Sequence, residues 1–181
     1  SVGEYFKEDA IKYSYEYITE VLKVDKDKLW FTVYKDDDEA YDIWKNVIGV
    51  PEKRIQRGNE DNFWHMNIPG PCGPCSEIFI DRGSKYGEDG GPIGGGEDRF
   101  IEIWNLVFME SIQDQPFQVI DELPKKNIDT GMGLERIAMI MQDKDNLFDT
   151  DLFKPLHDAL LSKITVNDNK YEKIIIDHIK S

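Results

Sequence analysis

The chain has 181 residues, of which 40% are hydrophobic and 32% charged, so it is long enough for one domain with a hydrophobic core and too apolar to be disordered. Its 36 acidic and 22 basic residues give a net charge of −14, which argues against broad binding to DNA or to a membrane surface, although not against a local basic patch. The absence of a long apolar run argues against a membrane span, and two cysteines fit a reducing compartment, so we expect a soluble, cytoplasmic protein, with an organelle as the alternative.

The first fifty residues predict helices and strands in alternation. Residues 8–23 carry apolar side chains at helical spacing, and the short run 29–34 is rich in the aromatic and β-branched residues of strands. The acidic run 36–38 then offers N-caps for a helix that should end at Gly49, because Pro51 cannot continue it.

The middle of the chain is rich in glycine and proline. The sequence GPCGPC (70–75) predicts a turn and excludes, on this reasoning, a helix or a central strand, whereas 76–81 has the composition of a strand. Seven of the fourteen residues in 83–96 are glycine, which favours a mobile loop. The longest strand candidate is 100–109, and a second loop is expected at 111–118.

The remaining elements are a short strand and three helices. We expect the strand at 118–120, a helix starting at Leu134 that is packed on most sides, a helix at about 151–163 and a last helix from about Tyr171. Strands separated by long loops, with helices that are not strictly interleaved, favour an α+β domain with a largely antiparallel sheet.

Two polar residues stand out among apolar neighbours. Asn105 is the one polar residue among the odd-numbered positions of strand 100–109, and Asp129 lies just ahead of a pair of glycines. A buried amide or carboxylate must be hydrogen-bonded, and a ligand ammonium with its three donors would satisfy both. The alternatives are that Asn105 pairs with neighbouring backbone and that Asp129 caps the next helix.

The glycine pair Gly131 and Gly133 stands where that next helix begins. Glycines there let a ligand approach the backbone closely, but the third glycine of the dinucleotide-binding fingerprint is replaced by Arg136, so a Rossmann site is not predicted. An arginine one turn into such a helix could bind a phosphate or stack on a base. The alternative is an ordinary strand-to-helix turn with a solvated arginine.

Two further features remain ambiguous from their composition. Cys72 and Cys75 have zinc or redox spacing, but the three histidines are scattered and there is no second such pair, so a tight turn with two thiols is favoured and no metal site is predicted. Trp64, at the edge of the glycine–proline segment, could line a pocket or pack in the core.

Five segments, taken together and in order, resemble one family. They are similar to the aminoacylation domain of the alanyl-tRNA synthetases, a class II ligase family, and DTGMGLER looks like that family's version of class II motif 3. The resemblance extends over almost the whole chain and is carried by GEYFKEDAI, LWFTVYKDDDEAYDIW, DNFWHMNIPGPCGPCSEIFIDRG, EDRFIEIWNLVFM and LPKKNIDTGMGLERIA.

The resemblance implies a class II fold, an antiparallel sheet flanked by helices. Residues 1–165 would be part of the catalytic domain, and 166–181 the start of a helix leading to a tRNA-recognition region. In the family, motif 1 and most of motif 2, with its α-phosphate arginine, precede the position of Ser1. We therefore interpret the chain as the C-terminal part of a catalytic domain from a longer protein, and we expect little or no ATP–pyrophosphate exchange from the chain alone.

The resemblance also implies a reaction and an amino-acid site. ATP and alanine would form alanyl-adenylate and pyrophosphate, and alanine would then pass to its tRNA. The net charge of −14 indicates that the tRNA is bound mainly by regions outside this chain. Asn105 and Asp129 would hold the α-ammonium, with Gly131 against the substrate and Trp64 as a wall of the alanine pocket.

The ATP side is implied in the same way. Arg136 would contact the adenine and the terminal phosphate, so that it joins Asn105 and Asp129 as a catalytic residue, and Gly133 would lie at the nucleotide. Mg²⁺ would accompany the phosphates, and Glu102 is a possible ligand, although strand alternation places it on the opposite face from Asn105.

The sequence departs from the family in its cysteine segment. Some members continue the two cysteines into two histidines that complete a zinc site, whereas this chain has Arg82 and Lys85 at those positions. The rival hypothesis for function is a non-catalytic synthetase-like module that binds a protein partner. The joint presence of Trp64, Asn105 and Asp129 with Arg136 favours the enzyme.

Overall fold

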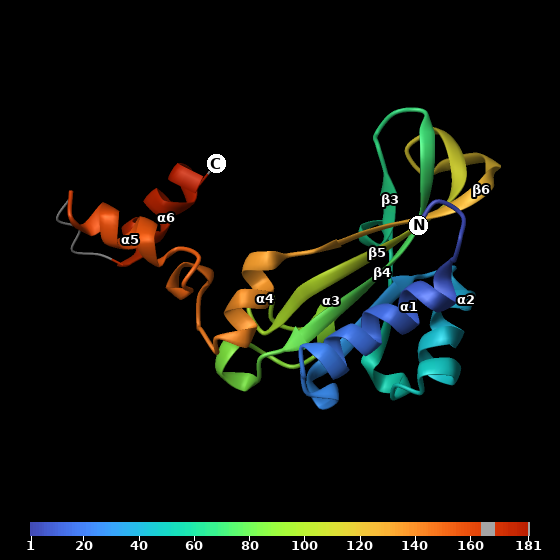
Figure 1. Ribbon diagram of the computed structural model, residues 1–181. Coiled ribbons are helices and arrows are strands. Elements are labelled where there is room, and N and C mark those ends of the chain that lie inside the picture. The colour runs from blue at the N-terminus through green and yellow to red at the C-terminus, as the bar shows by residue number, and fades with distance from the viewer. Residues whose placement is uncertain (164–168, 181) are drawn as a thin grey trace. The chain divides into compact units, whose positions relative to one another are not determined.

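The computed structural model describes residues 1–163 and 169–180 and divides the chain into two compact units, Ser1–Met132 and Gly133–Ser181 (Figure 1). The first unit contains a β-sheet with helices, and the second is helical. The predicted α+β class is thereby confirmed. None of the helices in the described part of the chain combines the length and the apolar character needed to cross a bilayer.

A six-stranded sheet forms the centre of the first unit. Its strand order is β2-β1-β4-β5-β6, with β3 beside β4, and every pairing is antiparallel except the parallel pair of β1 and β2. The sheet is therefore largely antiparallel, as predicted. Its strands are β1 (Leu29–Tyr34), β2 (Ile55–Gly58), β3 (Phe63–His65), β4 (Gly70–Asp81), β5 (Phe100–Gln115) and β6 (Gln118–Met132).

The predicted helices of this unit are also present. Both of these helices continue as π-helical turns. The second helix has Asp37 as its N-cap, and the Asp37 carboxylate accepts a hydrogen bond from the Ala40 N–H at 3.0 Å. It ends at Gly49, which adopts a left-handed φ of +80°. The elements are α1 (Lys7–Glu16) with Tyr17–Val21, α2 (Asp38–Asp42) with Ile43–Ile48, α3 (Gly91–Gly94), and 3-10 turns at Lys26–Lys28, Glu52–Arg54, Glu60–Asn62 and Ser84–Tyr86.

Helices α1 and α2 pack along one face of the sheet (Figure 1). The core of this face includes Phe31 and Trp44, whose ring centroids are 4.1 Å apart, and the Trp44 indole donates a hydrogen bond to Ser76 Oγ at 2.8 Å. Side chains of a strand alternate between faces, so Glu77, next to Ser76, belongs to the opposite face. We call this opposite face, which carries Thr32, Glu77 and Asn105, the polar face.

The prediction that GPCGPC (70–75) is not a central strand is wrong, because these residues form the first half of β4, between β3 and β5. The pairing with β5 is irregular here, with a register shift between Cys72 and Cys75, and such a bulge tolerates the missing N–H of Pro74. Gly73 is required for the close approach of β5, because a Cβ at this position would lie 1.9 Å from the Phe108 carbonyl oxygen.

The two predicted loops are also more ordered than expected. The loop at 111–118 is replaced by a tight connection, since β5 extends to Gln115 and β6 starts at Gln118 and far exceeds the predicted strand 118–120. The glycine-rich segment 83–96 contains α3, which the Gln56 side chain holds through hydrogen bonds to the Gly90 carbonyl and the Ile93 N–H. Glycine content alone did not reveal these side-chain contacts.

The second unit contains the three predicted helices, α4 (Leu134–Met141), α5 (Lys154–Leu161) and α6 (Asn169–Lys180). Its core includes Phe153, Leu160 and Ile176. Helix α4 buries Ile137 and Met139 but leaves Leu134 66% exposed, so the prediction of a helix packed on most sides is wrong. The predicted domain boundary at 165/166 lies outside the described residues.

A buried lysine ties α1 to the rest of the first unit. Lys7 Nζ, in a side chain that is 4% exposed, contacts Asp37 Oδ1 at 2.9 Å and Glu39 and Glu110 at 3.3 Å each. Burial alone lowers the pKa of Lys7, but the three carboxylates, Asp37 first, outweigh it and raise the pKa above 10.5. The same Asp37 carboxylate caps α2, so one ion pair fixes both helices.

Replacing Lys7 by Met should lower the free energy of unfolding by about 3–5 kcal/mol, because it leaves the buried Asp37 carboxylate without a cation. The measurement is denaturant unfolding at pH 7, where the ion pair is complete; the contribution of the charged lysine is lost as the pH rises through the raised pKa of Lys7. The matched control is Lys12→Met, which removes the exposed pair with Glu8 and should lower the free energy of unfolding far less, because solvent screens that pair. Equal losses in the two variants would contradict this account.

Candidate functional site

One row of cross-strand partners spans four strands of the polar face. Thr32 of β1 pairs with Glu77 of β4, Glu77 with Asn105 of β5, and Asn105 with Gly131 of β6. Directly opposed residues in antiparallel strands share a face, so this row is continuous. The register thus brings Asn105 and Gly131, two of the predicted site residues, together.

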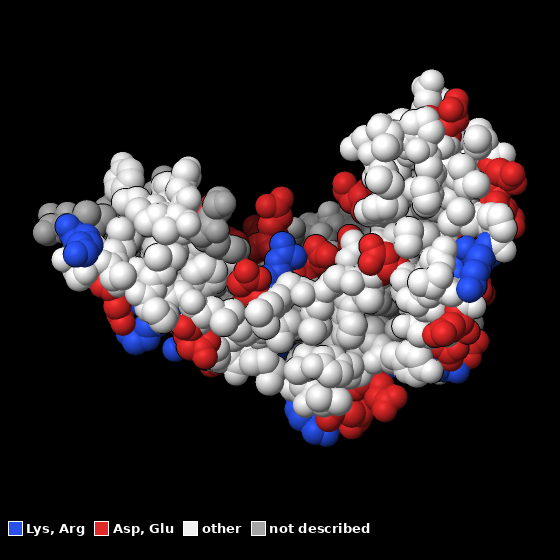
Figure 2. Space-filling view, turned by 45° about the horizontal axis from the view of Figure 1, so that its top comes forward, with Lys and Arg blue, Asp and Glu red and all other residues white. Residues whose placement is uncertain are grey.

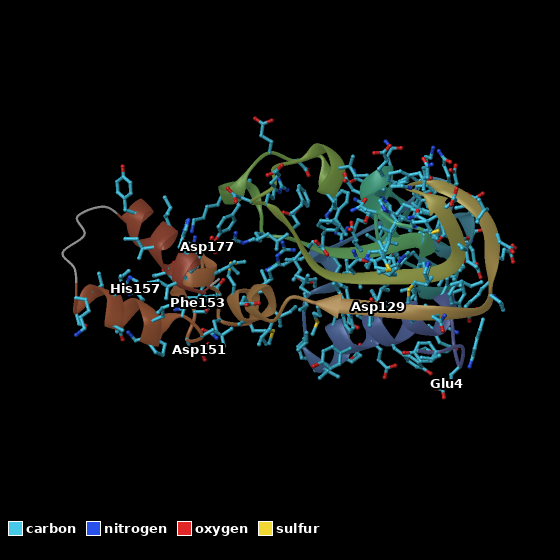
Figure 3. All side chains as sticks on the ribbon, turned by 90° about the horizontal axis from the view of Figure 1, so that it is seen from above. Glu4, Asp129, Asp151, Phe153, His157 and Asp177 are labelled. Carbon is cyan, nitrogen blue, oxygen red and sulfur yellow. The ribbon has the colours of Figure 1, made fainter. Side chains whose placement is uncertain are left out.

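Asp129 lies diagonally across from Asn105. It pairs with Val107, two residues along β5 from Asn105, and Figure 3 shows it on β6. Diagonal neighbours of this kind have Cα atoms roughly 7–8 Å apart, a distance that a bound group can bridge. The carboxylate is exposed, and its Oδ1 accepts a hydrogen bond from the N–H of Thr130 at 2.9 Å. Asp129 does not cap α4, whose N-cap is Gly133.

The centre of the row is a half-buried carboxylate with several hydrogen-bond donors. Glu77 Oε2 accepts from Thr32 Oγ1 at 2.9 Å and from Asn62 Nδ2 at 3.1 Å, and Glu77 Oε1 accepts from Asn105 Nδ2 at 3.4 Å. Asn62 also donates to Thr32 Oγ1 at 2.8 Å. The four side chains form one hydrogen-bonded network across β1, β4, β5 and the turn Glu60–Asn62.

The Asn105 amide is satisfied at one end only. Its nitrogen donates to Glu77, whereas its oxygen Oδ1 is buried and has no hydrogen-bond partner among the described residues. A buried amide oxygen without a donor is unfavourable by about 1–3 kcal/mol. The sequence-based alternative, in which the side chain pairs with neighbouring backbone, does not describe this arrangement, and an external donor would remove the deficit.

The network contains a carboxylate, Glu77, whose charged form is disfavoured by burial. Burial raises the pKa of the Glu77 carboxyl to about 7, and the carboxylates of Glu102 and Asp61 act in the same direction, against the hydrogen bonds from Thr32 and Asn62. A perturbed carboxyl of this kind is a common feature of binding and catalytic sites.

A β-bulge overturns the expectation for Glu102. The register shifts between Ile78 and Phe79, so that Glu102 pairs with Phe79, whereas Asn105 pairs with Glu77. Glu77 and Phe79 share a face of β4, and Glu102 therefore lies on the polar face with Asn105, not opposite to it. Simple alternation failed because the bulge adds a residue to β5.

The surface beside Asn105 is open at Gly131. A Cβ built on Gly131 would meet no atom within 4 Å, and its backbone has no positive φ that would require glycine. The absence of a side chain therefore leaves open space on the polar face at the residue that pairs with Asn105.

The other predicted residues are not part of this row. Trp64 is half-buried in β3 and pairs with Gly73, four residues before Glu77 along β4. Gly133 is the N-cap of α4, and Arg136 lies in the first turn of that helix, both in the second unit. Their roles at the site stay predictions.

The two cysteines are buried thiols in β4. Burial raises the pKa of Cys75 to about 12, and that of Cys72 is raised by the same cause, so neither thiol is activated as a nucleophile. Within residues 1–163 and 169–180, no group of three or more His, Cys, Asp or Glu side chains is arranged to hold a metal ion.

The whole chain matches the family model described as tRNA synthetases class II (A), over residues 1–181. The chain belongs to this family. It is similar along its full length to proteins named alanine–tRNA ligase: it is 48% identical to that of Corynebacterium glutamicum (strain R), 49% to that of Corynebacterium diphtheriae and 47% to that of Thermobifida fusca. It spans about 22% of the length of each of these relatives.

Sequence reasoning missed one member of this candidate site, Glu77. The strand SEIFID was predicted, but its single interior carboxylate was not singled out. A charged side chain between buried neighbours in a central strand was the available signal, because carboxylates are seldom buried without a partner or a function.

Replacing Glu77 by Gln should raise the free energy of unfolding of this synthetase chain at pH 8. The folded-state pKa of about 7 exceeds the ordinary 4.5, so the contribution of Glu77 is fully present below about pH 4.5 and is lost as the pH rises through 7. The gain at pH 8 should be on the order of 1–3 kcal/mol and should shrink towards pH 5. Denaturant unfolding in magnesium-free buffer at both values tests this, and a destabilised variant at pH 8 would refute it.

Proposed function

We propose that this chain forms part of the catalytic domain of an alanine–tRNA ligase. In the proposed reaction, a carboxylate oxygen of alanine attacks the α-phosphorus of ATP, pyrophosphate leaves, and alanine then passes from the adenylate to the 3′ end of its tRNA. The observation that carries this proposal is the partnerless Oδ1 of Asn105, a residue that pairs with Gly131, where the space is open, and lies diagonal to Asp129.

These groups suit the ammonium of a small amino acid. An ammonium offers three donors, of which one can reach the Asn105 oxygen and another the Asp129 carboxylate. The anionic Asp129 compensates the positive charge, and the neutral amide fixes its direction. The names of the similar proteins, alanine–tRNA ligases, support alanine as the amino acid.

Glycine at position 131 keeps this part of the polar face open to a substrate. A side chain there would occupy the open space at the residue that pairs with Asn105. We propose that Trp64 forms a further wall of the pocket, in keeping with its half-buried indole.

Adenylate formation needs no protein nucleophile, because orienting the two substrates and neutralising the phosphate charge lower the barrier. We assign Arg136 and the backbone at Gly133 to ATP. The carboxylate of Glu102, which the bulge turns to the polar face, is a hard oxygen ligand of the type that Mg²⁺ prefers. When bound, Mg²⁺ would neutralise phosphate charge.

The tRNA is assigned mainly to parts of the ligase other than this chain. Figure 2 shows acidic side chains in several groups over the visible surface, with fewer basic ones, in line with the net charge of −14. Such a surface repels a phosphate backbone. That the chain alone catalyses little exchange stays a prediction.

Replacing Asp129 by Ala in the full-length protein should raise the KM for alanine by about 100-fold or more, because truncating one partner of a charged hydrogen bond at a binding site costs several kcal/mol. The measurement is alanine-dependent ATP–pyrophosphate exchange. The control is Asp121→Ala, which removes an exposed carboxylate from the same strand and should leave the KM unchanged. An unaltered alanine dependence in the Asp129 variant would retire the assignment.

Replacing Gly131 by Ala should raise the KM for alanine by about 10-fold or more while the thermal stability is unchanged, because the added methyl meets no protein atom but occupies the space beside Asn105. The KM for ATP should change by less than about twofold. Gly94→Ala, another position where a Cβ meets nothing within 4 Å, is the control. Normal alanine kinetics in the Gly131 variant would show that the pocket lies elsewhere.

A further inference from the structure

We propose that Glu77 is a positioning residue that fixes which end of the Asn105 amide faces the substrate, and this rests on the proposed function. Glu77 is not expected to touch the substrate itself. Its role is to bind the amide nitrogen so that the amide oxygen is left for the ammonium.

The first step of the argument is the asymmetry of the partners. An ionised carboxylate only accepts hydrogen bonds, whereas a side-chain amide has a donating and an accepting end that differ by a simple flip. Glu77 Oε1 faces Asn105 at 3.4 Å, so the amide must turn its Nδ2 towards Glu77. Its Oδ1 then points away from the carboxylate, and this is the atom that lacks a donor.

The second step is that the flipped amide would be doubly unfavourable. Its oxygen would face the Glu77 carboxylate, which has no proton to offer, and its NH₂ group would face the ammonium of the substrate. Both contacts would be repulsive. The charge state of Glu77 therefore decides whether the oxygen or the NH₂ group of Asn105 faces the substrate.

The third step is that Glu77 is itself held from the other side. Thr32 and Asn62 both donate to Oε2, at 2.9 and 3.1 Å, so this oxygen cannot turn towards Asn105 without losing two hydrogen bonds. Asn62 is fixed in turn, since it is 3% exposed and lies against Gly58, where a Cβ would be 1.8 Å from Asn62 Oδ1. The carboxylate is thus a rigid acceptor.

This arrangement makes an unusual prediction for Glu77→Gln. The Gln oxygen would take the place of Oε2 and accept from Thr32 and Asn62, which leaves its NH₂ group facing Asn105. Asn105 would then flip, to offer its oxygen to Gln and its NH₂ group to the ammonium. The substitution is nearly isosteric, so alanine binding should be weakened without loss of the fold.

A second substitution should reverse the defect. In the double variant Glu77→Gln/Asn105→Asp, one carboxylate oxygen of the new side chain accepts from the Gln amide, and the other faces the ammonium. The donor and acceptor roles of the two positions are exchanged, but the pocket again presents an oxygen. A residue with a purely structural role would not show such a rescue.

The experiment measures alanine-dependent ATP–pyrophosphate exchange by the full-length protein and its variants at pH 8. Glu77→Gln should raise the KM for alanine by about 10- to 100-fold, the range for a hydrogen bond to a charged group, with the KM for ATP within about twofold of wild type. The double variant should recover at least about tenfold of this loss. Glu8→Gln, an exposed residue of α1, serves as the control and should behave as wild type.

Four results would overturn parts of this account. An unchanged alanine KM in Glu77→Gln, or a defect that the double variant does not relieve, would refute the positioning role. If the wild-type protein activates another amino acid in place of alanine, the proposed substrate is wrong, and the same variants measured with that amino acid decide the role of Glu77. If it activates none, both proposals fail.

Discussion

The hydrogen bond from Asn105 to Glu77 is the contact on which the interpretation of this structure depends, since it links the sheet to the proposed amino-acid site. It joins β5 to β4, the strand with the most partners in the sheet. Glu77 of β4 is in turn hydrogen-bonded to Thr32 of β1. Each participant is held by backbone pairing, so the orientation of the amide is set by rigid elements and not by a loop. Sites supported in this way keep their geometry before a ligand arrives.

Two irregularities of the sheet decide what lies beside that contact. The register shift between Ile78 and Phe79 turns Glu102 to the polar face, and this places a second carboxylate near Glu77. The shift between Cys72 and Cys75 accommodates proline and glycine in a central strand. The packing of Phe31 on Trp44 on the opposite face stabilises the sheet and offsets the cost of the buried polar groups. An unfavourable polar face on a well-packed sheet is the usual arrangement of a functional site.

Local signals in the sequence were sufficient for most elements and for part of the site. The cap at Asp37, the left-handed Gly49 and the strand 29–34 follow from short-range chemistry, and Asn105 was visible as a polar residue among apolar ones. What could not be predicted depends on pairing between strands. The strand at GPCGPC exists because β5 approaches Gly73, and the face of Glu102 is set by a bulge that leaves no mark in the residues of β5 themselves.

The chemical identity of residue 77 is itself informative. Glutamine would have nearly the same shape, could still accept from Thr32 and Asn62, and would avoid the burial of a charge that raises the pKa of this carboxyl to about 7. For folding alone, glutamine is therefore the better residue. Glutamate differs in one respect, because it accepts hydrogen bonds on both sides and so dictates the direction of the Asn105 amide. Under the proposed function, the ligand that the amide oxygen would receive accounts for glutamate at this position.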